Sequence, residues 1–303
     1  MNYTIENEYF TAVLSTNGAE LQSLKRKSNG KDFIWCGDPE IWKNHAPILF
    51  PFIGRPVASY FTIENQKCEY TKNHGFVRGS ETKVILQETN KIIFELTESE
   101  NTLYRFPYHF SLQSEYELKG NSLLWKLTVK NTDSKAFKFA IGTHTAFACP
   151  RKDDSTATEI SDYVIEFDGH EKLTGVKCTS EGYVEADDKG QVPLTFEYGE
   201  KDSGFVPLTD KGFGNGHLFT DFKSKWVGLR NKKDNSLVKI STDGFPYCML
   251  WQNTSGKPSF VCIEPWMGLP ENNKSDHIWD HLPEMNLLQP GQIFTSVQNI
   301  SVE

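Results

Sequence analysis

Residues 122–129 read Ser-Leu-Leu-Trp-Lys-Leu-Thr-Val, and this stretch alternates with a period of two. Leu123, Trp125, Leu127 and Val129 would lie on one face of an extended strand, because successive side chains of a strand point to opposite faces. A helix would instead need apolar residues three or four positions apart. The stretch therefore predicts a β-strand with one face in a core.

The same period recurs on both sides of this stretch. In 109–118, Phe110, Leu112, Tyr116 and Leu118 share one register. Turn sequences such as Asn-Gly and Asp-Gly separate many of the alternating segments, as in hairpins. The other predicted strands are 8–15, 19–26, 82–88, 91–97, 136–141, 225–230, 236–242 and 259–264.

Many short strands with hairpin spacing indicate an all-β protein, built as a large antiparallel β-sandwich or a related barrel. A short helical turn is expected only at 38–43. The stretch 150–222 is the least regular, and we interpret most of it as a solvated loop excursion. No linker, fixed-period repeat or low-complexity tract divides the chain, so we expect a single domain over 1–303.

The chain is acidic and rich in aromatic residues. Its 32 Lys+Arg against 40 Asp+Glu give a formal charge of −8, and no basic run offsets it. Such a surface would repel nucleic acid. No apolar stretch approaches the roughly 20 residues that cross a bilayer, and the first residues do not resemble a signal peptide. We therefore expect a cytoplasmic protein with neither nucleic acid nor membrane as partner; the sequence does not indicate an oligomeric state.

The six cysteines are scattered, without a C-x-x-C pair. No Cys/His grouping has the spacing of a zinc site. In a chain of this length without a secretory signal, such cysteines are typically reduced and buried. We expect no disulfide framework, no metal and no cofactor.

Three residues stand in settings that suit acid–base chemistry. Glu264 ends the apolar run 260–263 and precedes Pro-Trp, so its carboxyl should be desolvated and its pKa raised toward a value useful for proton transfer. His144 directly follows the predicted strand 136–141, and His74 precedes a glycine that permits close backbone approach.

Each of these residues also has a structural interpretation. A single histidine beside a glycine is most often structural, Glu264 could cap a strand or pair with an arginine, and Arg55 could be a plain surface charge. Together, two imidazoles and a carboxylate among glycines and aromatic residues suit general acid–base chemistry on a neutral polar substrate. A sugar fits that description.

A series of short motifs, found in one order along almost the whole chain, resembles the aldose 1-epimerase (galactose mutarotase-like) family, especially its LacX-type branch. Each motif alone is modest, but their combined order is specific. The motifs are Gly18–Leu24, Trp35–Trp42, Pro47–Pro51 with Gly54-Arg55, His74–Phe76, Tyr104–Tyr108, Gly142–Phe147 and Cys262–Trp266.

This resemblance implies a large antiparallel supersandwich with a site in a cleft on its concave side. It also implies cofactor-free interconversion of the α and β anomers of an aldose. Glu264 resembles the general base that removes the proton from the C1 hydroxyl, and His144 resembles the general acid that protonates the ring oxygen. The ring opens to the aldehyde, C1 rotates, and closure on the other face gives the other anomer.

The resemblance also suggests substrate-binding residues. His74 and Arg55 resemble the residues that hold the ring oxygen and neighbouring hydroxyls. Trp266 lies two positions from Glu264 and Phe76 two positions from His74, and both rings could face a sugar. At a position where many relatives carry an Asp that contacts sugar hydroxyls, this chain has Asn215. An amide can still hydrogen-bond a hydroxyl, but without charge assistance.

Two alternatives to a free-hexose epimerase remain at this stage. A hexose-6-phosphate 1-epimerase would need a cationic cluster, such as Arg55 with Arg78 and a lysine, and the acidic charge mildly disfavours it. A non-catalytic carbohydrate-binding protein could keep the cleft. The Glu264/His144 pair distinguishes this last class, because a pure binder needs no acid and base across one bond.

Overall fold

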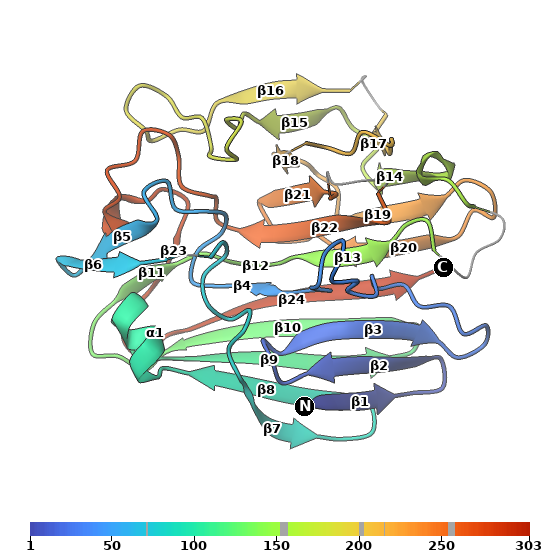
Figure 1. Ribbon diagram of the computed structural model, residues 1–303, viewed down its shortest axis with the longest axis horizontal. Helices are drawn as coiled ribbons and strands as arrows, with labels where there is room; N and C mark the ends of the chain where they lie inside the picture. The colour runs from blue at the N-terminus through green and yellow to red at the C-terminus, as the bar shows by residue number, and fades with distance from the viewer. Residues whose placement is uncertain (71, 152–156, 200–202, 215, 254–257) are drawn as a thin grey trace.

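The computed structural model describes residues 1–70, 72–151, 157–199, 203–214, 216–253 and 258–303 (Figure 1). Almost all of the regular structure is β, and all of the paired strands run antiparallel. This confirms the predicted all-β class with large antiparallel sheets. The helices are α1 (Glu100–Arg105) and the 3₁₀ turns η1 (Ile160–Asp162) and η2 (Trp279–His281).

The largest sheet has nine strands and includes the stretch 122–129. In chain order its strands are β7 (Lys83–Gln87), β8 (Lys91–Thr97), β9 (Phe110–Lys119), β10 (Ser122–Asn131), β14 (Tyr163–Phe167), β17 (Phe205–Pro207), β19 (Trp226–Asn231), β20 (Leu237–Ser241) and β24 (Ile293–Val302). They lie side by side in the order β17-β14-β19-β20-β24-β10-β9-β8-β7. Trp125 of β10 is buried, stacks on Tyr116 of β9 at 4.9 Å between ring centroids, and donates its indole N–H to Ser114.

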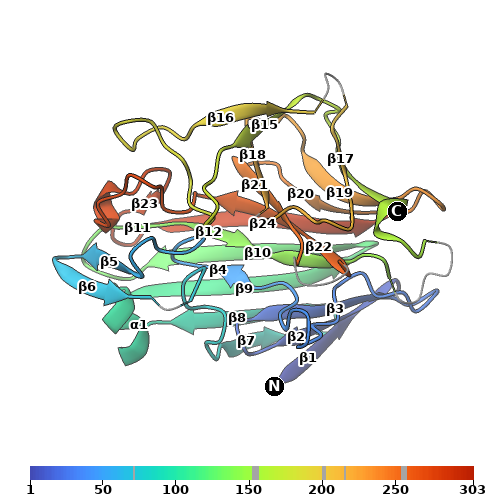
Figure 2. The same cartoon turned by 45° about the horizontal axis from the view of Figure 1, so that its top comes forward.

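A second sheet of eight strands lies beside the first (Figures 1 and 2). Its strands are β4 (Ile48–Leu49), β12 (Ile141–Thr143), β13 (Thr145–Ala148), β15 (Leu173–Val176), β16 (Thr195–Tyr198), β18 (His217–Thr220), β21 (Tyr247–Trp251) and β22 (Phe260–Met267). Its order is β16-β15-β18-β21-β22-β12-β4, and β13 also pairs with β22.

Three smaller sheets complete the fold: β1 (Asn2–Glu6), β2 (Phe10–Ser15) and β3 (Glu20–Arg26); β5 (Tyr60–Ile63) with β6 (Gln66–Glu69); and β11 (Phe137–Phe139) with β23 (Asn286–Leu288). The sheet β1–β3 meets the nine-stranded sheet, where Tyr3 contacts the ring of Phe94 edge-on and Tyr116 donates its hydroxyl to the carbonyl of Ala19. None of the helices in the described ranges has the length and apolar character needed to span a bilayer.

One apolar cluster joins the two large sheets. It contains residues of β10 and β24 as well as Phe147, Phe219 and Ile263 of the eight-stranded sheet. A buried hydrogen bond also crosses between them, because Thr143 of β12 donates to the amide oxygen of Gln298 on β24 at 2.8 Å. The single domain expected over 1–303 stays a prediction.

One local expectation differs from the structure. The stretch 150–222 contains β14 to β18 and therefore contributes strands to both large sheets. The segment 38–43 forms a single hydrogen-bonded turn, as expected, in which the N–H groups of Ile41 and Trp42 both donate to the carbonyl of Asp38.

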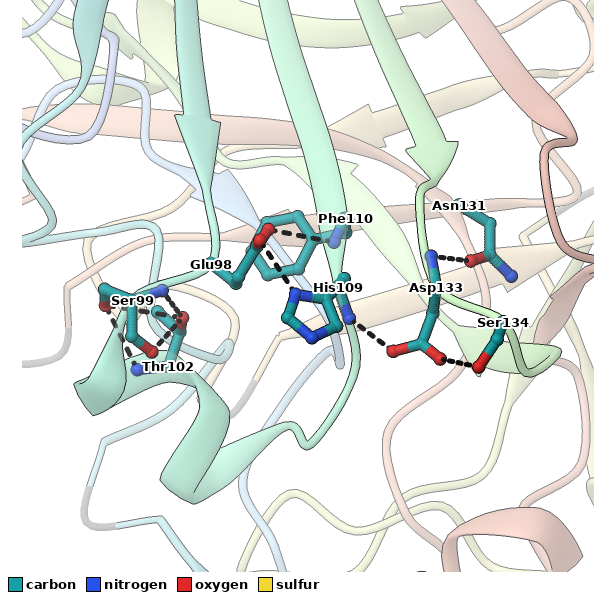
Figure 3. A network of polar contacts seen from close by, with 8 residues as sticks. All are labelled: Glu98, Ser99, Thr102, His109, Phe110, Asn131, Asp133 and Ser134. Atoms are coloured by element: carbon teal, nitrogen blue, oxygen red, sulfur yellow. Dashed lines mark hydrogen bonds and ion pairs between the residues drawn. The ribbon is translucent and has the colours of Figure 1, made fainter.

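Helix α1 was not expected, and it depends on a capping box. Ser99 accepts a hydrogen bond from the Thr102 N–H, and the Thr102 hydroxyl oxygen accepts one from the Ser99 N–H. Beside this cap, Glu98 accepts from the Phe110 N–H and pairs with His109 at 2.8 Å (Figure 3). These contacts tie the start of the helix to the start of β9.

Candidate active site

Strand β22 supplies the carboxylate. Phe260, Cys262, Glu264 and Trp266 alternate along it and therefore share one face. All four are buried, and the residue Glu264 is 1% exposed. The apolar run that marked this segment in the sequence thus carries a carboxyl group into an environment without bulk water.

Strand register brings His144 opposite Glu264. On one side of His144, Gly142 of β12 pairs with Trp266; on the other side, Thr145 of β13 pairs with Ile263. The intervening position therefore faces Glu264, since opposed residues of antiparallel strands have neighbouring side chains. The Nε2 atom of His144 lies 3.3 Å from Oε1 of Glu264.

Gly142 is required for this arrangement. A Cβ atom there would lie 2.6 Å from Cδ1 of the Trp266 ring and 3.0 Å from the carbonyl oxygen of Pro265. Both distances are too short for a side chain, so the close pairing of β12 with β22 needs a glycine.

A left-handed turn presents His74 to the same site. His74 has φ +66° and Gly75 φ +75°, and a Cβ on Gly75 would lie 1.9 Å from the carbonyl oxygen of Phe50. The Nδ1 atom of His74 accepts a hydrogen bond from the Gly54 N–H at 3.1 Å. In the neutral imidazole the proton is therefore on Nε2. The His74 ring lies edge-on to that of His144, with centroids 5.5 Å apart.

These residues line one pocket of about 280 Å³. The pocket brings together Arg55, His74, His144, Glu264 and Trp266, which the sequence had singled out from widely separated segments. The further lining residues are Trp42, Gly54, Asn73, Arg78, Glu181, Gly182, Met249, Trp251 and Pro270.

Burial moves the two facing ionisable groups in opposite directions. It raises the pKa of Glu264 well above its usual range, and the nearby indole N–H of Trp266 opposes this shift without making a hydrogen bond of acceptable geometry. Burial, followed by the positive charge of Arg78, lowers the pKa of His144 to about 3. Burial therefore favours the uncharged form of each group, the protonated carboxyl and the neutral imidazole.

The polar atoms of the pair lack partners within the described part of the chain. Both oxygens of Glu264, Nδ1 of His144 and Nε1 of Trp266 are buried there without a hydrogen bond. Leaving a buried polar group unpaired costs about 1–3 kcal/mol. Several such groups at the floor of one pocket are typical of a site whose partners arrive with a ligand.

Sequence reasoning missed the aromatic enclosure of His144. Trp42 stacks on the imidazole with centroids 5.0 Å apart and planes inclined by 28°, and Trp251 contacts it edge-on at 5.7 Å. Both indoles also line the pocket. The only signal for Trp42 was its place in the Trp35–Trp42 motif; nothing in the sequence marked Trp251.

Three other proposed binding residues have different placements. Arg55 is exposed and lines the pocket. Phe76 does not line it: this side chain is buried in the core, where its ring contacts Phe50 and Phe110. Asn215 lies outside the described residues. The structure thus assembles the acid–base residues together, but it gives Phe76 a packing position.

Comparisons with known proteins agree with the motif series. The model of the aldose 1-epimerase family matches residues 1–301. The chromosomal protein LacX of Lactococcus lactis subsp. lactis is 30% identical over 297 residues, which cover 96% of this chain and 95% of the relative. Its plasmid counterpart is 29% identical with the same coverage.

Solved structures give the same result. A galactose mutarotase related enzyme from Lactobacillus acidophilus is 26% identical, with a TM-score of 0.91 over 100% of this chain and 97% of that one. A galactose mutarotase-like protein from Lactobacillus casei ATCC 334 is 25% identical, with a TM-score of 0.88 and full coverage of both chains.

Proposed function

The chain belongs to the aldose 1-epimerase family, and we propose that it interconverts the α and β anomers of a hexose at the His144–Glu264 pair. Family membership makes the protein an isomerase of the mutarotase type that acts on a sugar. The finer assignment, with named residues and a named reaction, is our proposal.

Ring opening needs a base and an acid acting across one C–O bond. Glu264 removes the proton of the C1 hydroxyl, the bond between C1 and the ring oxygen breaks, and His144 gives its proton to that oxygen. The product is the open-chain aldehyde, and C1 can turn before the reverse steps close the ring on its other face. Each group contributes about 10²–10⁴-fold to such a step.

The uncharged forms that burial favours in the free site match the second half of this reaction. After ring opening, Glu264 carries the proton and His144 is neutral, which is the state that burial favours in the free pair. Opening the ring needs the opposite arrangement, in which Glu264 is ionised and His144 carries the proton. Sugar hydroxyls that donate to the carboxylate would favour that arrangement, because hydrogen bonds to a charged group stabilise it.

One observation carries the proposal: a buried imidazole nitrogen lies 3.3 Å from a buried carboxyl oxygen at the floor of a pocket, and neither oxygen of that carboxyl has a hydrogen-bond partner in the described ranges. A binding protein gains nothing from this costly pairing. The pair therefore supports the epimerase over the non-catalytic alternative.

A second candidate function is that of a hexose-6-phosphate 1-epimerase, and the charged residues that line the pocket support it. Arg55 and Arg78 both line the pocket, and within the described ranges neither forms an ion pair. Glu181 is the one further carboxylate of the described lining. Arginines bind phosphate oxygens in a bidentate manner, so this end of the pocket suits an anionic substituent.

Exchange spectroscopy at equilibrium tests both candidates. The rate of exchange between the α and β C1–H signals is measured by NMR for glucose, galactose and their 6-phosphates, with and without protein. We expect acceleration proportional to the protein concentration. Faster exchange of the 6-phosphate at equal concentration would select the second candidate, whereas sugar binding without acceleration would leave only a binding protein.

A further inference from the structure

A thiol adjoins the proposed acid–base pair. One ligand atom each from His144, Cys262 and Glu264 lies within 4.8 Å of the others, and all three residues are buried. Cys262 and Glu264 are two positions apart on β22 and share its inner face. Cys262 has no part in the proposed reaction, so its place beside the pair is not explained by that reaction.

We propose that this His144–Cys262–Glu264 cluster binds a thiophilic divalent cation, Zn²⁺ or Cd²⁺, and that the bound ion inhibits the enzyme. Imidazole, thiolate and carboxylate are the ligands that zinc uses in proteins. The inhibition rests on the proposed function, because the ion would occupy the two groups that the reaction needs. The binding itself does not depend on that function.

The geometry of the pair fits tetrahedral zinc. Two nitrogen or oxygen ligands at about 2.0–2.1 Å from zinc, separated by the tetrahedral angle, lie about 3.4 Å apart. The Nε2 atom of His144 and Oε1 of Glu264 are 3.3 Å apart. Cys262 lies on the same strand face as Glu264, and a water would be the fourth ligand.

The charge balance also fits. A neutral imidazole, a thiolate and a carboxylate together carry two negative charges, which a divalent cation neutralises within a buried site. The thiol proton and the carboxyl proton are released to solvent when the ion binds. Oε1 of Glu264, which has no hydrogen-bond partner in the described ranges, gains the ion as its partner.

The surroundings indicate an inhibitory site and not one built for a resident metal. A metal-binding histidine normally donates its other ring N–H to a carboxylate, a carbonyl or water. Nδ1 of His144 has no such partner in the described ranges. Arg78, which lines the same pocket, adds a positive charge that opposes a cation.

Cadmium titration tests the site directly. CdCl₂ is added to the wild-type protein, and binding is followed by the ultraviolet charge-transfer absorption of the cadmium–thiolate bond and by calorimetry. We expect one ion per chain, a parallel loss of anomer exchange that EDTA reverses, and weaker binding in the presence of a saturating sugar. ZnCl₂ should inhibit in the same way.

Cys262→Ala should keep anomer exchange and weaken cadmium binding by at least about tenfold, the scale on which metal sites respond to lost interactions. Cys36→Ala is the matched control, because Cys36 is an exposed thiol; it should leave the absorption and the inhibition unchanged. Glu264→Gln keeps the thiol but removes a ligand, so it should weaken binding equally and tests the site even if Cys262→Ala does not fold.

The outcomes separate this inference from the proposed function. Cadmium binding that is unchanged in Cys262→Ala and Glu264→Gln, or that disappears in Cys36→Ala, would overturn the metal site. If the wild type catalyses exchange but neither absorbs nor loses activity with cadmium, the metal site alone is wrong. If it binds cadmium through Cys262 but accelerates no sugar, the metal site holds and the epimerase proposal fails.

Discussion

The central residues are two groups whose environments move their pKa values in opposite directions. Burial raises the pKa of the Glu264 carboxyl well above its usual range, and burial together with Arg78 lowers the pKa of the His144 imidazole to about 3. One proton shared by two groups at 3.3 Å is what an opening and closing reaction needs, because each half-reaction returns the site to the state that begins the other.

The first prediction concerns these two residues. Glu264→Gln and His144→Asn should each lower anomer exchange by about 10²–10⁴-fold, because each removes a group that transfers a proton. Sugar affinity, measured by calorimetry, should remain largely intact. Glu197→Gln, at an exposed position on β16, is the matched control and should exchange at the wild-type rate. Near-wild-type exchange in either site variant would show that the roles are assigned wrongly.

A second prediction follows from the lowered pKa of His144. In the unfolded chain its pKa is near 6.5, and in the folded protein it is about 3. The stability contributed by the neutral buried imidazole is therefore fully present above pH 6.5 and is lost as pH falls toward 3. The variant His144→Gln has no imidazole at this position, so it should not show this loss of stability at low pH.

Urea unfolding measures the effect. Between about pH 7 and pH 4, the free energy of unfolding of the wild type should fall relative to His144→Gln by a few kcal/mol, on the order that linkage allows. His109→Gln is a control in which the free energy of unfolding should depend on pH in the opposite direction. Glu98 raises the pKa of His109, so its contribution is present at low pH and is lost as pH rises through that raised value. A difference between wild type and His144→Gln that does not change with pH would contradict the expectation.

A third prediction separates the two candidate substrates. If the substrate carries a phosphate, Arg78→Gln should raise KM for the 6-phosphate by about tenfold or more, since a hydrogen bond to a charged group is worth about 1.5–3 kcal/mol. The KM for the unphosphorylated sugar in the same variant is the internal control and should change much less, because the effect of Arg78 on the pKa of His144 is common to both sugars. Equal effects on both sugars would exclude Arg78 as a phosphate ligand.

At the scale of elements, the period of two predicted strands where apolar residues point inward. It found β10, β9 and β8 within a residue or two of their ends. It missed β24, because this long strand reverses the usual pattern. Ser296 and Gln298 point inward and are buried, whereas Ile293 and Val297 are exposed. Polar inner positions, stabilised by the bond from Thr143 to Gln298, interrupt the hydrophobic alternation, although Ile300 and Val302 farther along the same face are buried in the core.

Part of the site could be predicted from the sequence, because the local pattern of apolar residues that indicates strands also indicates where a polar residue is buried on one of them. Glu264 follows an apolar run on a buried strand, and that signal is local. The buried position of Phe76 could not be predicted from the residues next to it in the sequence. Positive φ angles at His74 and Gly75 interrupt the extended backbone, so His74 and Phe76 do not share a face as they would in a strand. His74 lines the pocket and Phe76 packs into the core.

The fourth prediction concerns helix α1, which the sequence analysis did not predict. Its capping box satisfies N–H groups that the first turn leaves unpaired, so Ser99→Ala should lower the free energy of unfolding by about 0.5–2 kcal/mol. Urea denaturation provides the measurement. Ser28→Ala, at an exposed position in the turn after β3, should have almost no effect. Equal stability of the two variants would argue against the cap.

At the scale of the whole molecule, the acidic charge and the pocket differ in sign. The chain carries a formal charge of −8, yet the described pocket lining holds Arg55 and Arg78 against Glu181 and Glu264, and burial raises the pKa of Glu264 and so favours its uncharged form. Composition mildly disfavoured an anionic substrate, and it could not show this local reversal. Only the fold brings together residues from segments as distant in sequence as Arg55 and Glu264.

The central claim is that the buried His144–Glu264 pair opens and closes a sugar ring. NMR exchange between the α and β anomers at equilibrium tests it most directly, with glucose, galactose and their 6-phosphates as substrates. The account predicts exchange that rises in proportion to the wild-type protein for at least one of these sugars and disappears in Glu264→Gln. Exchange that the wild-type protein does not accelerate for any of them would contradict it.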